Sequence, residues 1–342
     1  MSDTESSLSV RTIDNIQDID ELQNILDTIG ANLEMPSKIL APSLRTYWLL
    51  SFVKAYGSSR KLAITVVFED GFPRLIMPLQ CKNDTCLEFL CDETSDYNDF
   101  FYGRIDVELF KYAWMYWISR GIKRIFLYRL PPDSKTIELF SAISAEIGLE
   151  IEIKKCDSLP VVITQPEKEI QNWEGVKRHS IKRYKRKQNA LARIADISFS
   201  FIETQNQLIE LFPEIRHLHI TRWELNNVYS KYLDPKREAF IINICKTAIE
   251  DSSLFFPIMK INGVLAAYII GFRYGETIFD WNTSFSVDYF QWSPGALLLL
   301  HILSNSKKFG YSKYNLLKGL ESYKFIWTNI IEDNLSLLIT VK

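Results

Sequence analysis

The stretch that decides the fold is Gln291-Trp292-Ser293-Pro294-Gly295-Ala296, which is followed at once by the four leucines Leu297–Leu300. Ser293 is a suitable N-cap and Pro294 suits a first helical turn, so the stretch predicts a helix over 293–309 after a strand. Gly295 carries no side chain, so a phosphate could approach the backbone N–H groups, and the helix dipole favours an anion there. Two interpretations stand side by side. One is an anion-binding loop made by Gln291, Ser293, Pro294, Gly295 and Ala296, and the other is an ordinary capped core helix.

Two hairpins with a glycine turn indicate an internal repeat. The first joins Lys61–Phe68 to Arg74–Leu79 through Gly71, and the second joins Leu254–Lys260 to Val264–Phe272 through Gly263. Helices and further strands follow each hairpin in a similar order, which is faintly typical of two copies of one unit. Because hairpins dominate, we expect mostly antiparallel sheets.

The length of 342 residues suits two domains of roughly 100–200 residues each. We therefore expect an α/β (α+β) chain of two tandem lobes, residues 1–160 and 161–342, each with a mixed, mainly antiparallel sheet flanked by helices. The expected helices cover 17–29, 43–56 with Ser43 as N-cap, 107–119, 133–147, 167–194, 205–223, 235–250 and 293–309. The further expected strands cover 87–90, 124–128, 149–153, 197–202, 276–282, 313–317 and 334–341. About the first eight residues are expected to be a frayed tail, and 156–166 to close the first lobe.

The composition narrows the class of protein. Apolar residues make up 47% and the formal net charge is −2, so each half can bury a core and the whole chain does not point to nucleic acid. The five cysteines match no common zinc spacing, and His217 and His219 fall on different helix faces, so no metal site is expected. The N-terminus lacks the pattern of a signal peptide, and no apolar run approaches the roughly 20 residues of a membrane span. We expect a cytoplasmic protein with reduced cysteines.

Several segments together resemble a known family. Ser293-Pro294-Gly295-Ala296-Leu297-Leu298, then Gly310, then Tyr314–Trp327 with its Tyr323-Lys324-Phe325-Ile326-Trp327 element, resemble the CelD-like acetyltransferase family, named for cellulose biosynthesis, within the GNAT superfamily. Further similar segments, which extend the likeness over roughly residues 40–330, are Ser43–Trp48, Met77–Leu79, Asp96–Asp99, Lys177–Arg193 and Arg222-Trp223. Two positions depart from the family, which usually has an acidic residue where Asn315 stands and often another where Leu320 stands.

The resemblance implies two tandem GNAT-like lobes, as in Fem-type peptidyltransferases, with an acyl-CoA site in the C-terminal lobe. It implies acetyl-CoA or another acyl-CoA as co-substrate and a small-molecule or sugar acceptor, in polysaccharide or cell-envelope biosynthesis.

Three residues are candidates for the chemistry. Asp280 lies among apolar residues of a predicted strand, so burial could raise its pKa towards that of a useful base; the alternative is a strand residue paired with a neighbour. By the resemblance, Tyr323 could donate its proton to a leaving thiolate, and Lys324 could stabilise negative charge or contact a CoA phosphate. The alternative is that Tyr323 packs with its aromatic neighbours while Lys324 faces solvent.

A basic segment precedes these residues. Between 175 and 195 no acidic residue accompanies eight positive charges, which belong to Lys177, Arg178, Lys182, Arg183, Lys185, Arg186, Lys187 and Arg193. The segment is either a solvated helix face or a surface for a phosphorylated acceptor, for the adenosine phosphate of CoA, or for RNA. Only Tyr184 interleaves the charges, so DNA and RNA are not favoured as partners. Candidate substrate-binding residues are Arg183, Arg186, Arg222 and Trp223.

Three functions follow from the sequence. The leading one is transfer of an acyl group, acetyl above all, from acyl-CoA to an amine or hydroxyl. A Fem-type aminoacyl transferase that uses charged tRNA is the second. A catalytically silent GNAT-like binding module is the third, and the departures at Asn315 and Leu320 favour it. The oligomeric state, the acceptor and the acyl group are left open.

Overall fold

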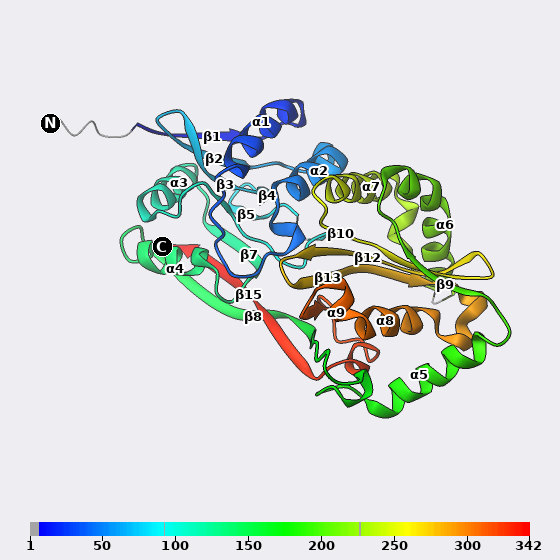
Figure 1. The fold of residues 1–342 in the computed structure, drawn as a ribbon. Helices are drawn as coiled ribbons and strands as arrows, with labels where there is room; N and C mark the ends of the chain where they lie inside the picture. Colours follow the sequence, from blue (N-terminus) through cyan, green and yellow to red (C-terminus); the bar gives the residue numbers. More distant parts are fainter. Residues whose placement is uncertain (1–6, 92, 226) are drawn as a thin grey trace. The chain divides into compact units, whose positions relative to one another are not determined.

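The computed structural model describes residues 7–91, 93–225 and 227–342, which fold into two units (Figure 1). The first unit contains Met1–Asp157 together with Asp333–Lys342, and the second contains Ser158–Glu332. The division expected at residues 160 and 161 therefore differs at the C-terminus, because the last ten residues fold with the first unit. Among the described residues, no helix is both long enough and apolar enough to cross a bilayer.

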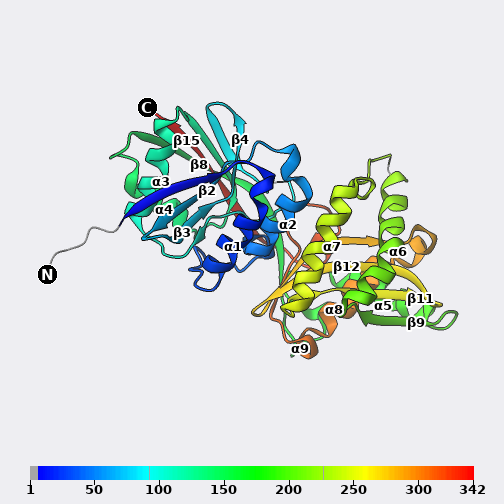
Figure 2. The same cartoon turned by 90° about the horizontal axis from the view of Figure 1, so that it is seen from above.

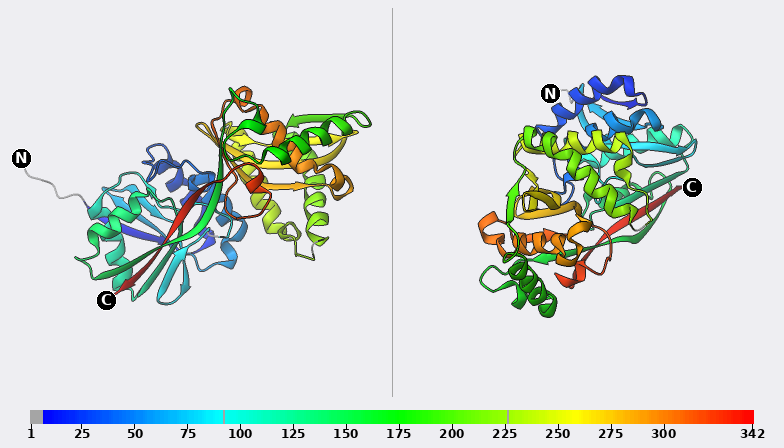
Figure 3. Two further views of the ribbon diagram at one scale, coloured as in Figure 1. Left: turned by 90° about the horizontal axis from the view of Figure 1, so that it is seen from below. Right: turned by 90° about the vertical axis from the view of Figure 1, so that its right-hand side faces the viewer.

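The first unit contains two sheets. Strands β1 (Leu8–Ile13), β2 (Ile64–Glu69), β3 (Phe72–Met77) and β6 (Phe101–Tyr102) pair in that order, all antiparallel. The second sheet joins β4 (Leu79–Asn83), β5 (Cys86–Phe89) and β7 (Arg124–Leu130) to the C-terminal part of β15 (Ile330–Val341), which lies beside the N-terminal part of β8 (Leu149–Ile163) (Figure 3). The helices are α1 (Ile19–Gly30), α2 (Thr46–Tyr56), α3 (Val107–Ser119) and α4 (Lys135–Ile143), with short 3-10 turns at Ile16–Asp18, Pro42–Leu44 and Gly57–Ser59.

The second unit is built on one sheet. Its strands follow the order of the C-terminal part of β8, then β14 (Lys313–Asn315), β13 (Thr277–Phe285), β12 (Val264–Tyr274), β11 (Pro257–Ile261) and β9 (Ile197–Phe201), while β10 (Leu254–Phe255) also pairs with β12. The helices are α5 (Arg178–Leu191), α6 (Gln205–Glu224), α7 (Pro235–Glu250), α8 (Pro294–Ser304) and α9 (Ser306–Phe309), with 3-10 turns at Ile170–Asn172, Lys231–Leu233, Val287–Trp292 and Lys324–Ile326. Helices α6 and α7 cover one face of this sheet, and α5 and α8 lie on the other (Figures 1 and 2).

Strand β13 has two irregularities, which are a short pairing with β14 and a bulge opposite β12. It pairs in parallel with β14 only through Thr277, Ile278 and Phe279, and it then runs on to Phe285 alongside β12. A bulge follows at once, because Asp280 lies opposite Gly271 whereas Asn282 lies opposite the preceding residue, Ile270. The extra residue breaks the usual alternation of side chains.

Gly271 is required at this bulge. A β-carbon there would lie 2.9 Å from the carbonyl oxygen of Phe279, which is closer than β-carbons come to a backbone atom, and 3.2 Å from that of Phe255, which is a tight contact. On the bulged strand, Trp281 packs against Phe240 of α7 on one face. Asp280 points to the other face, where Tyr314 donates a hydrogen bond to it.

The two glycine hairpins have the same turn conformation. Asp70 and Gly71 have φ values of 51° and 80°, and Asn262 and Gly263 have values of 51° and 79°. Two consecutive positive φ angles are typical of the type I′ turn that suits the twist of a hairpin. The faint repeat noted in the sequence thus has a local counterpart in each unit.

Several predicted element boundaries were wrong for identifiable reasons. Helix α2 begins at Thr46, and Ser43 does not cap it. The hydroxyl of Ser43 instead donates to the carbonyl of Tyr97 at 2.6 Å. The long helix expected over 167–194 begins only at Arg178, since Gly175 takes a left-handed conformation with φ of 76°. The helix expected over 293–309 is interrupted at Asn305 and divides into α8 and α9.

Two strands were also misjudged. Strand β1 (Leu8–Ile13) was not predicted and begins at the end of the expected tail, while residues 1–6 of that tail lie outside the described residues. The strand expected over 149–153 continues to Ile163, so most of 156–166 is strand and does not close a lobe. Helix α7, in contrast, has the predicted bounds, because Asp234 caps it and Pro235 occupies its first turn.

Candidate active site

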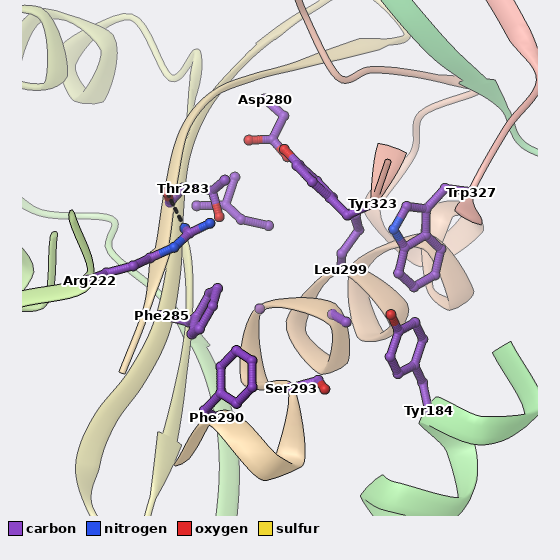
Figure 4. A pocket seen from close by; sticks show the side chains of 13 residues that line it. Tyr184, Arg222, Asp280, Thr283, Phe285, Phe290, Ser293, Leu299, Tyr323 and Trp327 are labelled. Atoms are coloured by element: carbon purple, nitrogen blue, oxygen red, sulfur yellow. Dashed lines mark hydrogen bonds between the residues drawn. The ribbon is translucent and has the colours of Figure 1, made fainter. Parts of the chain in front are cut away.

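A pocket of about 280 Å³ lies in the second unit, where β13 runs past the end of β14 (Figure 4). Its apolar and aromatic lining comes from Tyr184, Ile269, Phe285, Phe290, Ala296, Leu299 and Trp327. Its other lining residues are Arg222, Asp280, Thr283, Ser293, Gly295 and Tyr323. Because Arg222 belongs to α6 and Leu299 to α8, helices from both faces of the sheet contribute to one pocket.

Asp280 is the acidic residue of this lining. Its side chain is almost fully buried, and Tyr314 Oη donates to its Oδ2 at 3.1 Å. Its other oxygen, Oδ1, is also buried and has no hydrogen-bond partner within the described parts of the chain. Burial raises the pKa of Asp280 to about 6, against the hydrogen bond from Tyr314 and the charge of Lys324, which lower it. A carboxylate with such a pKa can accept a proton near neutral pH.

Tyr323 lies across the pocket from the sheet. The residue is 38% exposed, and its hydroxyl points towards the carboxylate of Asp280 (Figure 4). Burial and then the negative charge of Asp280 raise the pKa of the Tyr323 phenol above its usual range. The phenol is therefore protonated at neutral pH and can donate that proton.

Lys324 is not among the residues that line the pocket, and it does not face solvent. It is 3% exposed, and its Nζ donates to the carbonyl oxygens of Leu317 at 3.1 Å and Lys318 at 2.6 Å. Glu321 completes the set with an ion pair at 3.1 Å. An ammonium satisfied in this way holds the loop after β14, and its charge also lowers the pKa of Asp280. A direct role of Lys324 in the chemistry stays a prediction.

The loop before α8 has an unusual backbone. Ser293 is left-handed, with φ of 57° and ψ of 54°, and Leu297 N–H donates the first helical hydrogen bond to its carbonyl. The N–H groups of Gly295 and Ala296 precede that bond, so the helix itself provides no acceptors for them. Pro294 is buried in the first turn and Gln291 is exposed, and neither lines the pocket.

The side chain of Ser293 does not cap α8, contrary to expectation. It contacts the basic helix instead, because Lys187 Nζ lies 2.9 Å from Ser293 Oγ and also donates to the carbonyl of Gln291. Burial and then the charge of Arg183 lower the pKa of Lys187. A cation of α5 is thus held at the positive end of the α8 dipole, where an anion would be stabilised.

Gly295 has a second reason to be glycine. A β-carbon at this position would lie 3.2 Å from the ring of Phe285. The absent side chain therefore makes room for an aromatic wall of the pocket.

The four candidate substrate-binding residues separate in the structure. Arg222 lines the pocket, with its guanidinium 4.2 Å from the centre of the Phe285 ring. Trp223 is outside the lining and stacks on His219. Arg183 and Arg186 are exposed on α5, and neither lines the pocket.

The two departures from the family pattern also lie outside the lining. Asn315 is buried, and its Oδ1 accepts a hydrogen bond from Leu317 N–H at 2.9 Å. Leu317 has φ of 56°, so the amide of Asn315 supports a strained turn. Leu320 is 57% exposed. Neither departure therefore removes an acidic residue from the pocket lining, which contains Asp280.

Sequence reasoning did not identify Tyr314, Thr283, Phe285 or Trp327 as site residues. Thr283 and Phe285 belong to β13, Tyr314 to β14, and Trp327 to the segment after the last 3-10 turn, so the tertiary fold brings these three parts of the chain together. Among the residues that the structure describes, no cluster of three or more His, Cys, Asp or Glu side chains could hold a metal ion.

Comparisons with known proteins agree with this architecture. Residues 178–325 match a family model described as an acetyltransferase (GNAT) domain. No curated protein matches the chain. The CelD-like family within GNAT remains a prediction from the sequence.

Three solved structures show a similar fold. FemX is 9% identical, with a TM-score of 0.59 over 98% of this chain and 97% of its own. A conserved protein of unknown function from Bacteroides thetaiotaomicron is 13% identical, with a TM-score of 0.60 over 98% and 100%. The C-terminal domain of a putative lysylphosphatidylglycerol synthetase from Agrobacterium fabrum is 13% identical, with a TM-score of 0.55 over 93% and 91%. At these identities the likeness to the three structures concerns the fold alone, and the domain match concerns residues 178–325.

Proposed function

We propose that the second unit transfers an acyl group, most simply acetyl, from acyl-CoA to an amine or hydroxyl acceptor. The observation that carries this proposal is the meeting of Asp280 and Tyr323 in one pocket, which also reaches the start of α8. A carboxylate with a pKa near 6 and a protonated phenol are the base and acid that acyl transfer needs. The acceptor would be a small molecule or a sugar, in line with the resemblance to polysaccharide-associated enzymes.

The start of α8 suits the pyrophosphate of CoA. The N–H groups of Gly295 and Ala296 have no acceptor within the helix, and the helix dipole favours negative charge at this end. Lys187 already lies against Ser293 and Gln291 and could donate to a phosphate oxygen. The apolar walls at Leu299, Phe285 and Trp327 suit the less polar arm and the acyl group of such a donor.

The chemistry follows from the two side chains. Asp280 accepts the proton of the acceptor amine or hydroxyl as its nitrogen or oxygen bonds to the acyl carbon. Tyr323 gives its proton to the sulfur as the carbon–sulfur bond breaks. The products are the acylated acceptor and the free thiol, and solvent returns the proton from Asp280 to Tyr323.

The proposal can be tested with Tyr323→Phe. We expect the rate of acyl transfer, or of acetyl-CoA hydrolysis in the absence of an acceptor, to fall about 10²–10⁴-fold. Calorimetric affinity for CoA should stay within about twofold of the wild-type value. Tyr229→Phe, which changes an exposed tyrosine of the same unit, serves as the matched control. Full activity of Tyr323→Phe would remove the phenol from the mechanism, and CoA binding without any turnover would favour the silent module.

A second candidate is transfer of an aminoacyl group from charged tRNA. The exposed side chains of Lys182, Arg183 and Arg186 on α5 favour it, because none of them forms an ion pair among the described residues. FemX has the same overall fold. Filter binding of aminoacyl-tRNA at about 50 and 200 mM salt separates the two candidates, since a phosphate-contacting surface loses affinity steeply with salt.

A further inference from the structure

We propose that the acceptor carries a carboxylate close to its nucleophilic amine or hydroxyl, and that Arg222 binds this carboxylate. The inference rests on the proposed acyl transfer and adds the chemical class of the acceptor. It starts from the position of Arg222, whose side chain comes from α6 and lines the same pocket as Asp280 and Tyr323.

The guanidinium of Arg222 is held in a defined plane. Its central carbon lies 4.2 Å from the centre of the Phe285 ring, and its Nη1 donates to the carbonyl of Thr283 at 3.3 Å. Figure 4 shows the side chain reaching past Thr283 towards the space between Phe285 and the pair of Asp280 and Tyr323. An oriented guanidinium loses less conformational freedom on binding than a mobile one, which favours recognition of a planar group.

The charge of the lining favours a monoanion. Among the described residues that line the pocket, Arg222 is the cation and Asp280 the anion. A carboxylate carries one negative charge and matches the fork of a guanidinium through two parallel hydrogen bonds. A phosphate dianion would bring two charges against one arginine in a mostly apolar pocket, so we assign the carboxylate.

The arrangement also explains how an acceptor could be oriented. Arg222 and Asp280 come from α6 and β13, and both face the same cavity. A molecule anchored at Arg222 by its carboxylate can present a neighbouring amine or hydroxyl to Asp280. The acyl donor would then occupy the opposite side of the pocket, along Leu299 and the start of α8.

The test compares acceptors that share a primary amine and differ in the group beside it. Glycine and β-alanine are paired with glycinamide and β-alaninamide, and 2-aminoethyl phosphate is added to test for a phosphate. Thermal stability in saturating CoA and the rate of acetyl transfer are measured for each compound. We expect the wild type to favour each carboxylate over its amide by about 10- to 100-fold in kcat/KM, and Arg222→Gln to abolish that preference. Arg237→Gln is the matched control, because Arg237 also stacks on an aromatic ring, Trp281, but does not line the pocket.

Three results would overturn the inference. One is a wild type that neither binds nor acetylates the carboxylates better than their amides, and another is a preference for 2-aminoethyl phosphate. The third is an equal loss for carboxylates and amides in Arg222→Gln, which would place Arg222 on the transferred acyl group. Calorimetry with CoA alone keeps the two proposals apart, because absence of CoA binding contradicts acyl transfer itself rather than the role of Arg222.

Discussion

Asp280 shows, at the scale of one residue, how a buried carboxyl that is proposed for catalysis can oppose stability. Its carboxyl is buried, one oxygen accepts from Tyr314, and the other has no partner within the described chain. The protonated form is therefore favoured in the folded state, where the pKa is about 6 rather than the ordinary value near 3.8. Between these two pH values the folded chain holds more protons than the unfolded chain, so stability falls as the pH rises.

Asp280→Asn should stabilise the protein at pH 7.5 and have little effect near pH 4. The gain is at most about 3 kcal/mol, from a shift of roughly two pKa units at 1.36 kcal/mol each. An amide keeps an acceptor for Tyr314 and removes the buried charge. Denaturant unfolding at both pH values measures the difference, with the exposed Asp288→Asn as control. A gain that is equal at the two pH values would show that the charge of Asp280 is not its cause.

At this scale the sequence was informative where burial alone decides the chemistry. The apolar neighbours of Asp280 predicted a raised pKa, because strand alternation places such a residue in the core. The environment of Lys324 could not be predicted in the same way. Its partners are carbonyl oxygens of Leu317 and Lys318, and these converge only because Leu317 adopts a left-handed backbone.

At the scale of the element, α5 and the start of α8 act together. The periodicity of α5 buries Ile181, Tyr184 and Leu191, and α5 packs against α8. This packing brings Lys187 to the loop before α8. Charge counting left open a solvated face or an anion-binding surface on this helix, and it could not distinguish Lys187 from its basic neighbours.

Lys187→Met should weaken CoA binding about tenfold, if a charge-assisted hydrogen bond to phosphate of about 1.5 kcal/mol is lost. Methionine keeps the apolar stem, so α5 should pack as before. Lys185→Met is the matched control, because its ammonium bonds Gln171 and Glu169 instead of the loop. Calorimetry at low and high salt checks the result, since the salt dependence should also decrease in Lys187→Met. Equal losses in the two variants would indicate only the general charge of α5.

The accuracy of the element boundaries depended on local signals. Asp234 and Pro235 mark the start of α7 unambiguously, and both ends of that helix were predicted. The start of α5 has no such cap. The polar residues before it have sufficient helical propensity to be predicted as helix, although they do not form one. In the structure, the positive φ of Gly175 separates these residues from the helix. A glycine can adopt a positive φ but need not do so, so the sequence alone did not predict this helix start.

At the scale of the whole molecule, the chain does not divide at a single point. Strand β15 leaves the second unit at Glu332, and its remaining residues belong to the first unit. Leu337 and Ile339 lie in the same core cluster as Phe110 and Trp114. The length and the repeat predicted two lobes that each consist of one continuous segment. The pairing of β15 with strands far away in the sequence could not be predicted, because no short stretch of residues indicates it.

This division predicts that the two units respond to different perturbations. Leu337 is 1% exposed in the core of the first unit, so Leu337→Ala should lower the stability of that unit by about 2–5 kcal/mol. All residues that line the pocket belong to the second unit, so CoA should stabilise that unit by mass action. Calorimetric scans should therefore show two transitions, with CoA raising one and Leu337→Ala lowering the other, while the calorimetric affinity for CoA at 25 °C is unchanged. The conservative Leu337→Met should leave both transitions nearly in place, because it preserves the buried volume. A single transition that CoA raises and Leu337→Ala lowers would mean that the two units unfold together, and the long strands β8 and β15, which run through both, would then be the connection to examine by substitution.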